Sequence, residues 1–263
     1  MNSTNLLTNS PRYSNTDMKA PLAYIIVGQL MLLPAWELVA RSGMAGLTVP
    51  TPLSVIDVYL EPRFAALLCR SAIATAGSAF IGLSVGILLG TTTAFIAHLA
   101  PPLKPGIDRL AVTVNAIPAV AIAPIFILLV SRDITPILLA TIAVFFLVYV
   151  AVSSGLRTAS RTLLEMVATF GGGRWQLLRY LEIPSALPSF MGGLKISVTA
   201  AMVGAVVGEW FGAPTGLGIV ILNTMQNFQI PLMWAAILAV AAVALAGYGV
   251  AHMAERFLSR RFS

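Results

Sequence analysis

Residues 134–156 read ITPILLATIAVFFLVYVAVSSGL, a run of 23 residues without a charged side chain between Asp133 and Arg157. A helix needs about 20 apolar residues to cross the hydrocarbon core of a bilayer, so this run predicts a transmembrane helix. Similar uncharged runs recur along the chain. Together they predict six spanning helices, at about 21–40, 71–98, 108–130, 134–156, 188–211 and 232–253.

The composition of the whole 263-residue chain is that of a membrane protein. Hydrophobic residues make up 58% and charged residues 10%, whereas a soluble domain carries about a quarter charged residues. This excludes a cytosolic enzyme, a disordered chain and a coiled coil. One cysteine and two histidines exclude a disulfide scaffold and leave too few ligands for a multi-histidine metal site, so no metal is predicted.

The basic residues predict the orientation of the chain. The net charge is +6, and in an apolar chain such an excess marks cytoplasmic loops more often than nucleic-acid binding. With six spans, most of the basic residues fall on the side of the two termini, which the positive-inside rule places in the cytoplasm. The basic residues on the opposite side are Arg41, Arg63, Arg70 and Arg132.

This topology predicts three segments. Residues 1–20 form a disordered cytoplasmic tail, residues 21–256 form the transmembrane domain with a cytoplasmic loop at 157–187, and residues 257–263 form a basic cytoplasmic tail. Within the domain, residues 219–231 are too polar to face lipid, and they predict a re-entrant or interfacial segment buried against protein.

Small residues predict helices that pack closely, and prolines predict a helix that bends. Small residues recur every fourth position at Ser78, Gly82, Gly86 and Gly90, and again at Ala200, Gly204, Gly208 and Gly212. Such ridges let helices approach closely, either within one subunit or at a seam between subunits. In the third span, Pro118 and Pro124 predict a bend or break, because each proline lacks a backbone donor.

A few polar residues in the spans are candidates for lining a transport pathway. A charge in mid-bilayer costs about 2.5–3.5 kcal/mol on insertion scales, so each intramembrane charge needs a partner or a function. Structural anchoring is the alternative for the two charged candidates, and ordinary helix bending is the alternative for the two in the third span. The four candidates are Asn115, Pro118, Lys195 and Glu209.

The cytoplasmic loop carries two amphipathic helix patterns. Residues 162–170 read TLLEMVATF, in which Thr162 is the expected N-cap and Glu165 stands at the capping-box position. The three glycines 171–173 end this helix, and RWQLLRYL at 174–181 starts another. Two helices at a glycine elbow predict a rigid lever joined to the fifth span, or alternatively a helix pair lying on anionic lipid.

The glycine triplet does not predict a phosphate site. A P-loop has the pattern G-x-x-x-x-G-K-[ST] after a strand, and this sequence contains no such pattern. We therefore expect that the chain does not hydrolyse ATP by itself.

The spacing of this loop resembles the EAA loop of binding-protein-dependent ABC importer permeases. That family pattern is Glu-Ala-Ala, three residues, glycine, nine residues and Ile-x-Leu-Pro. Glu165, Gly171 and Pro184 match it in identity and in spacing. Leu181 and Ile183 are conservative replacements within the last motif.

The resemblance implies that the loop docks in a groove on an ATPase subunit. Met166 and Val167 stand where the family has two alanines, so the groove must accept bulkier side chains. The residues implied in coupling to the ATPase are Glu165, Met166, Val167, Ala168, Phe170, Gly171 and Arg174.

The resemblance covers roughly residues 50–260. Within the family, the sequence resembles the branch that imports sulfonates, taurine, nitrate, bicarbonate or pyrimidine vitamin precursors. The resemblance implies an all-α type I ABC importer permease fold with six transmembrane helices. The segments that carry it are Val49-Pro50-Thr51-Pro52-Leu53-Ser54-Val55, Leu177-Leu178-Arg179, Pro184-Ser185-Ala186-Leu187-Pro188, Gly192-Gly193-Leu194-Lys195-Ile196, Gly208-Glu209, Gly216-Leu217-Gly218 and Gln226-Asn227.

A permease of this kind works in a bacterial-type cytoplasmic membrane. The implied partners are two ATPase subunits, which bind ATP and Mg²⁺, a second permease copy that forms a homodimer, and an extracytoplasmic solute-binding protein. The chain itself is implied to hold no cofactor and to catalyse no reaction. Its implied function is to couple ATPase closure to alternating access for a small polar or anionic solute.

Two other classes of protein are alternatives. An ion-coupled secondary transporter would use intramembrane acids as ion sites and often shows internal repeats, of which this sequence has no convincing example. A membrane-embedded enzyme would need clustered His, Asp or Cys residues, which the sequence lacks. The energy source distinguishes a secondary transporter from an ABC importer, because an ABC importer requires ATP and a binding protein.

Overall fold

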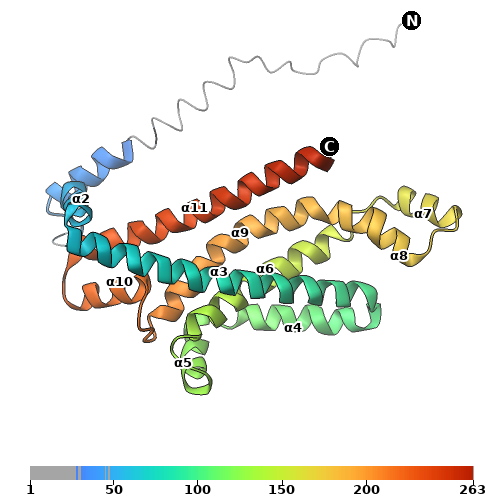
Figure 1. The fold of residues 1–263 in the computed structure, drawn as a ribbon, viewed down its shortest axis with the longest axis horizontal. Coiled ribbons are helices and arrows are strands. Elements are labelled where there is room, and N and C mark those ends of the chain that lie inside the picture. Colours follow the sequence, from blue (N-terminus) through green and yellow to red (C-terminus); the bar gives the residue numbers. More distant parts are fainter. Residues whose placement is uncertain (1–27, 29–30, 45, 47, 263) are drawn as a thin grey trace, which may run out of the picture. The chain divides into compact units, whose positions relative to one another are not determined.

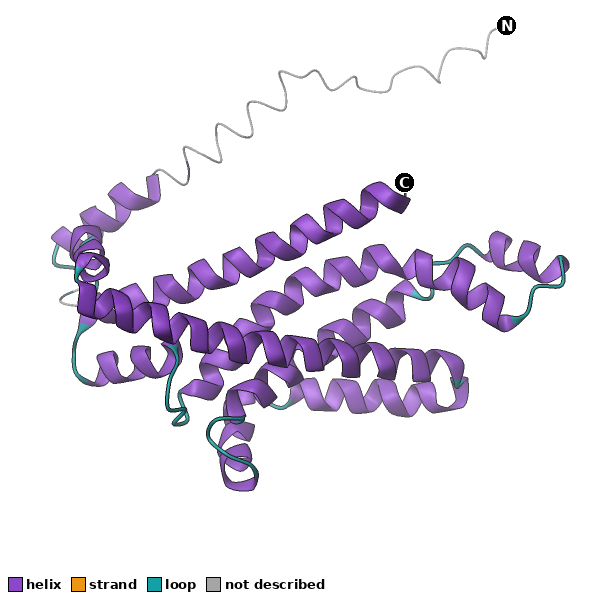
Figure 2. Cartoon of the chain, in the orientation of Figure 1, coloured by secondary structure: helices purple, strands orange, loops and turns teal. Residues whose placement is uncertain are grey.

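The computed structural model describes residues 28, 31–44, 46 and 48–262, without the side chains at 161, 168 and 258–262. The described residues form helices and loops only (Figure 2). They belong to two compact units, which divide after Asp57. The expected tail at 1–20 lies outside the described residues.

The first unit contains the described part of the predicted first span. Residues 31–41 are helical, and the Arg41 guanidinium forms an ion pair with Glu37 one turn earlier. The Trp36 indole donates a hydrogen bond to the Pro50 carbonyl at 2.9 Å. The first half of the predicted span at 21–40 is largely outside the described residues.

The second unit contains four helices long and apolar enough to cross a membrane, or five if one bent pair is a single span. A further helix, α2 (Pro52–Leu60), crosses the boundary between the units. The other elements are α3 (Pro62–Leu99), η1 (Pro101–Leu103), α4 (Lys104–Ala116), α5 (Ala119–Leu129), α6 (Thr135–Gly155), α7 (Arg161–Thr169), α8 (Arg174–Leu177), η2 (Leu178–Glu182), α9 (Ile183–Glu209), α10 (Leu217–Gln226) and α11 (Ile230–Phe262).

The core of the second unit is α6, which packs against α3 and against α9 (Figure 1). The glycines of α3 and α9 allow this close approach. A Cβ on Gly82 would lie 2.5 Å from the Ala140 Cβ, and a Cβ on Gly204 would lie 2.7 Å from the Ala140 Cα. The small-residue ridges therefore pack within one chain at these positions, as the first of the two interpretations expected.

The predicted third span is broken. Its two helices, α4 and α5, meet at 93°, and Pro118 is the residue before α5. Pro118 has no backbone donor, and proline disfavours the helical conformation of the residue before it, so the helix ends there. The bend predicted by the prolines is confirmed at Pro118, whereas Pro124 lies inside α5.

Two other helices extend beyond the ranges that the charges predict. Helix α3 begins at Pro62 rather than near residue 71, and α9 continues a helical path that begins at Arg174 rather than near residue 188. Charged residues mark where a helix leaves the lipid, not where its hydrogen bonds end. Pro188 lies inside α9, so the predicted start of the fifth span does not coincide with the start of a helix.

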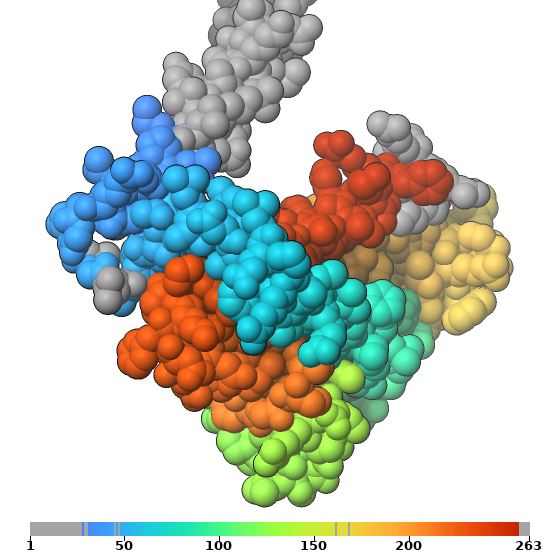
Figure 3. Space-filling model, turned by 60° about the vertical axis from the view of Figure 1, so that its left-hand side comes forward, coloured from blue at the N-terminus to red at the C-terminus, as the bar shows by residue number. Residues whose placement is uncertain are grey.

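The polar segment 219–231 contains α10, which packs on α3, α9 and α11. Its buried residues include Leu217, Gly218, Val220 and Thr224. Within 219–231, however, only Val220 and Thr224 are buried, whereas Asn223 and residues 225–229 are exposed. The expectation that this segment is buried against protein is therefore confirmed for only part of it. In the space-filling view, α10 (orange) lies beside the first turns of α3 (light blue) (Figure 3).

Candidate functional site

The candidate coupling element is α7, a helix that projects from the second unit and contacts α8 (Figure 1). It begins at Arg161, so Thr162 lies inside the helix and is not the N-cap that the sequence predicted. Its apolar side chains are open to the surroundings: Met166 is 51% exposed, and Phe170, the next residue after the helix, is 83% exposed. An apolar helix face that its own chain leaves uncovered is suited to a groove on another protein.

The elbow after α7 depends on Gly171. Its φ of +79° is a left-handed conformation that favours glycine over residues with a side chain. The next amide, of Gly172, donates a hydrogen bond to the Val167 carbonyl at 2.9 Å. This bond from five residues ahead closes the helix end as in a Schellman motif, and the predicted glycine stop is confirmed.

After the elbow, one long helical path runs from Arg174 to Glu209. It passes through the π turn η2 immediately before α9. Pro184 has no N–H for the ordinary helical bond, and a π turn just ahead of it accommodates the missing bond without ending the helix. Helix α8 is therefore continuous with the spanning helix α9.

A polar strap fixes α8 and η2 to the end of α3. The Arg174 Nη2 donates hydrogen bonds to the carbonyls of His98 and Leu99, each at 3.1 Å. These are among the last carbonyls of α3, which have no partner within the helix. The His98 ring Nε2 lies 2.8 Å from Glu182 Oε2. The strap joins residues more than 70 positions apart, so sequence spacing could not reveal it.

The other predicted coupling residues lie on α7 or next to it. Glu165 is exposed and has no ion pair or hydrogen bond through its carboxylate among the described side chains. Val167 is partly buried, and the side chain of Ala168 is not described. Glu165 thus has its carboxylate available for a partner, whereas Arg174 is engaged in the strap.

A second polar cluster that the sequence analysis missed joins α4 to α6. Asp108 accepts hydrogen bonds from Lys104 at 2.6 Å and from the Tyr149 hydroxyl. Lys104 and Asp108 are four residues apart, a spacing that favours a pair on one helix face. The Tyr149 contact spans 41 positions and depends on the packing of α4 on α6.

Of the four candidate pathway residues, two lie at the break in the third span. Asn115 is exposed in the last turn of α4, and Pro118 is exposed where α5 begins. The Asn115 side chain has no hydrogen bond among the described residues. These two residues are close in sequence and lie at one bend.

The other two candidates lie on α9 and have partners within the chain. Lys195 Nζ lies 2.7 Å from Glu255 Oε2 of α11. Glu209 is 1% exposed, and its Oε2 accepts the Gly218 N–H at 2.7 Å. Lys195 and Glu209 are 14 positions apart, about 21 Å along a helix. Among the described residues, no hydrogen bond or ion pair joins Lys195 or Glu209 to the bend at Pro118.

Comparisons with known proteins identify relatives over nearly the whole chain. The family described as "Binding-protein-dependent transport system inner membrane component" matches residues 82–263. The formylaminopyrimidine transport permease protein ThiX of Halalkalibacterium halodurans is 31% identical over 230 residues, covering 87% of this chain and 92% of that protein. The riboflavin transport system permease protein RibX of Chloroflexus aurantiacus is 33% identical over 242 residues, covering 91% and 90%.

A solved structure has the same fold. The inward-facing MetNI methionine ABC transporter matches with a TM-score of 0.65 at 16% sequence identity, covering 77% of this chain and 99% of that chain. At this identity the likeness shows the fold alone, which is that of the type I ABC importer permeases.

Proposed function

The chain belongs to the family of binding-protein-dependent transport system inner membrane components, the permeases of ABC importers, and we propose that it converts ATPase closure into alternating access through α7. As a permease, it is a multi-pass membrane subunit and not an enzyme. Permeases of this family pair with ATPase subunits and with a solute-binding protein.

The proposed assembly has two copies of this chain, two ATPase subunits that bind ATP and Mg²⁺, and one extracytoplasmic binding protein. The proposed topology has six spans with both termini in the cytoplasm of a bacterial cell. The excess of basic residues on the side of the termini and of α7 supports this orientation.

One observation carries the proposal: α7 leaves apolar side chains uncovered, and a short glycine elbow joins it to the continuous helical path that leads into α9. When ATP closes the ATPase dimer, a groove that holds α7 moves it, and the helical path from Arg174 to Glu209 tilts with it. The strap from Arg174 to α3 carries the same movement to a second spanning helix. Switching of this kind needs rigid elements with two packed arrangements.

The pathway is proposed to include Asn115 and Pro118, which are exposed at the bend between α4 and α5. For Lys195 and Glu209 the partners within the chain favour the anchoring role. The solute is proposed to be small and polar or anionic. Relatives named for formylaminopyrimidine and riboflavin transport support a small solute but do not specify one.

The decisive experiment changes the elbow. In proteoliposomes that contain the ATPase partner and the binding protein, Gly171→Val should lower solute uptake per ATP about tenfold, because a β-branched residue is strained at a φ of +79°. Gly173→Ala is the matched control, since Gly173 has an ordinary φ of −77° and no atom within 4 Å of an added Cβ. Wild-type coupling in Gly171→Val, with normal insertion, contradicts the lever.

Energy dependence tests the alternative class. Uptake by the reconstituted complex should require ATP and the binding protein, and it should continue when the proton gradient is collapsed at constant ATP. Uptake by the chain alone, driven by an ion gradient, would instead identify a secondary transporter.

A further inference from the structure

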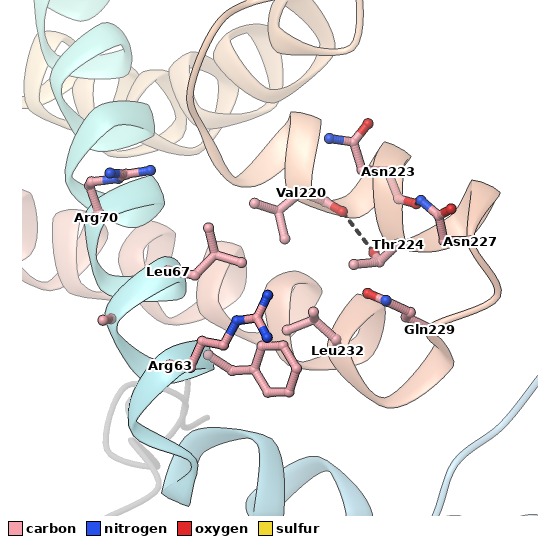
Figure 4. A pocket seen from close by; sticks show the side chains of 11 residues that line it. Arg63, Leu67, Arg70, Val220, Asn223, Thr224, Asn227, Gln229 and Leu232 are labelled. Atoms are coloured by element: carbon pink, nitrogen blue, oxygen red, sulfur yellow. Dashed lines mark hydrogen bonds between the residues drawn. The ribbon is translucent and has the colours of Figure 1, made fainter.

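A polar cavity lies between the first turns of α3, the second half of α10 and the start of α11 (Figure 4). Its volume is about 560 Å³, which lies within the range of pockets that hold small molecules. Its polar side chains include Arg63, Arg70, Asn223 and Gln229. This cavity is separate from the α7 elbow and from the bend at Pro118.

The two arginines make the cavity cationic. Arg63 and Arg70 are seven residues apart, two helical turns, and therefore share one face of α3. Figure 4 shows both guanidinium groups extending from α3 toward α10. Neither arginine takes part in the ion pairs found among the described residues, and no acidic side chain lines the cavity.

The facing wall supplies neutral hydrogen-bonding groups. Asn223 and Gln229 are exposed, and neither carboxamide has a hydrogen bond among the described residues. The Thr224 hydroxyl is already used, because it donates to the Val220 carbonyl at 2.7 Å (Figure 4). Two unpaired guanidinium groups opposite free carboxamides form a donor set for an oxyanion, since arginine binds carboxylate and phosphate groups in a forked geometry.

The position of the cavity gives it access to water. A 38-residue helix such as α3 is about 57 Å long, while the hydrocarbon core is about 30 Å thick. The end that carries Arg63 and Arg70 can therefore stand outside the lipid. Under the proposed topology this is the outer side, where the chain has few basic residues, and two of them line one cavity.

We infer that this cavity is a binding site, at the outer mouth of the transporter, for a small organic solute with a carboxylate, sulfonate or phosphate group. Apolar side chains of Leu67, Val220 and Leu232 line the same cavity and offer contacts for the rest of the solute. The inference rests on the proposed function for the outward position of the cavity. Anionic lipid headgroups share this chemistry, so the experiment must separate the two sources.

The test measures binding of ³⁵S-labelled ethanesulfonate to the full-length chain in phosphatidylcholine nanodiscs without ATP. Arg63→Gln and Arg70→Gln should each weaken binding about tenfold or more, because each removes charge-assisted hydrogen bonds. Arg132→Gln is the matched control, since it removes an exposed arginine that does not line the cavity. Arg63→Lys and Arg70→Lys should retain more affinity than the glutamine variants, and unchanged thermal unfolding of all variants excludes misfolding.

Several results would overturn the inference. These are no ethanesulfonate binding by the unsubstituted chain, equal binding by all variants, and a similar loss in Arg132→Gln. Phosphatidylglycerol nanodiscs that block binding through the same arginines would assign the site to lipid. If Arg63→Gln and Arg70→Gln bind ethanesulfonate normally but lose the ATP hydrolysis that the binding protein stimulates in the full complex, the arginines are assigned to docking of the binding protein. Because the ethanesulfonate-binding measurement uses neither ATP nor the ATPase, a negative result there leaves the Gly171→Val result intact.

Discussion

At the scale of single residues, Glu209 shows how a buried carboxyl group can hold a turn. Its Oε2 accepts the Gly218 N–H near the start of α10, where the helix dipole favours a negative group. A Cβ on Gly216, whose φ is +140°, would lie 2.2 Å from the Glu209 Cδ. The carboxylate therefore fits against a backbone that has no room for a side chain.

The substitution Gly216→Ala should lower stability by about 1–3 kcal/mol, because it adds backbone strain and a clash with Glu209. The measurement is the shift in thermal unfolding of the detergent-solubilised chain. Gly192→Ala is the control, because no atom lies within 4 Å of its added Cβ and alanine is favoured in a helix. Equal effects of the two changes would contradict the packing at Gly216.

A second residue-scale prediction separates anchoring from solute contact at Glu209. Glu209→Gln keeps an oxygen that can accept the Gly218 N–H, so uptake should stay within about twofold of normal. Glu209→Ala removes the acceptor and leaves a cavity, and it should destabilise the chain by about 2 kcal/mol or more. If Glu209→Gln abolishes uptake while unfolding is unchanged, the carboxylate charge is required and the pathway role is favoured.

At the scale of elements, the connection from α7 to α9 combines an elbow with a strap. The left-handed Gly171 sets the direction of the elbow. Beyond it, Arg174 satisfies carbonyls at the C-terminal end of α3, and Glu182 pairs with His98. The Arg174 hydrogen bonds are exposed and therefore worth little for stability, whereas the His98–Glu182 pair is partly buried. The expected effect of the Arg174 bonds is on how motion is transmitted.

The strap predicts a coupling defect without unfolding. Arg174→Gln should lower solute uptake per ATP several-fold and change stability by about 1 kcal/mol or less, because the hydrogen bonds are exposed. Uptake and ATP hydrolysis are measured on the same proteoliposomes. The control is Arg179→Gln, which removes an exposed charge of η2 that is not part of the strap and should keep normal uptake per ATP. If both variants lose uptake per ATP equally, coupling depends on the positive charge of the loop and not on the strap.

At the scale of the whole molecule, the proposed topology puts α7 and the cavity beside Arg63 on opposite sides of the membrane. Helix α3 begins near the cavity and ends at the strap. The two regions are thus joined by one helix that is long enough to cross the bilayer. A movement of α7 can reach the outer mouth through α3 as well as through α9.

The single cysteine of the chain, Cys69, allows a direct test of this topology. In a Cys69→Ala background, Asn227→Cys on the cavity wall should react with a membrane-impermeant maleimide in intact cells. Thr169→Cys at the end of α7 should react only after the membrane is permeabilised, because the proposed loop faces the cytoplasm. Labelling of Thr169→Cys in intact cells would reverse the orientation.

The pattern of charges located the long apolar helices of the second unit, but it did not predict the residues at which those helices begin and end. The apolar run at 134–156 became α6 with almost unchanged bounds, since neither end continues as a helix. The charges predicted a fifth span that begins near residue 188, yet one helical path that starts at Arg174 passes through Pro184 and Pro188. A π turn and the packing of α9 on α6 compensate for the missing donors, and local sequence does not reveal such compensation.

The sequence by itself determined that the chain crosses a membrane and that an elbow follows residues 162–170, because lipid partition and helix endings depend on neighbouring residues. Only the tertiary structure decided which groups meet. It brought Lys195 to Glu255, Arg174 to the end of α3, and Arg63 to a cavity wall formed by α10. These partners are far apart in the chain, and helix packing, rather than spacing, brings them within contact distance.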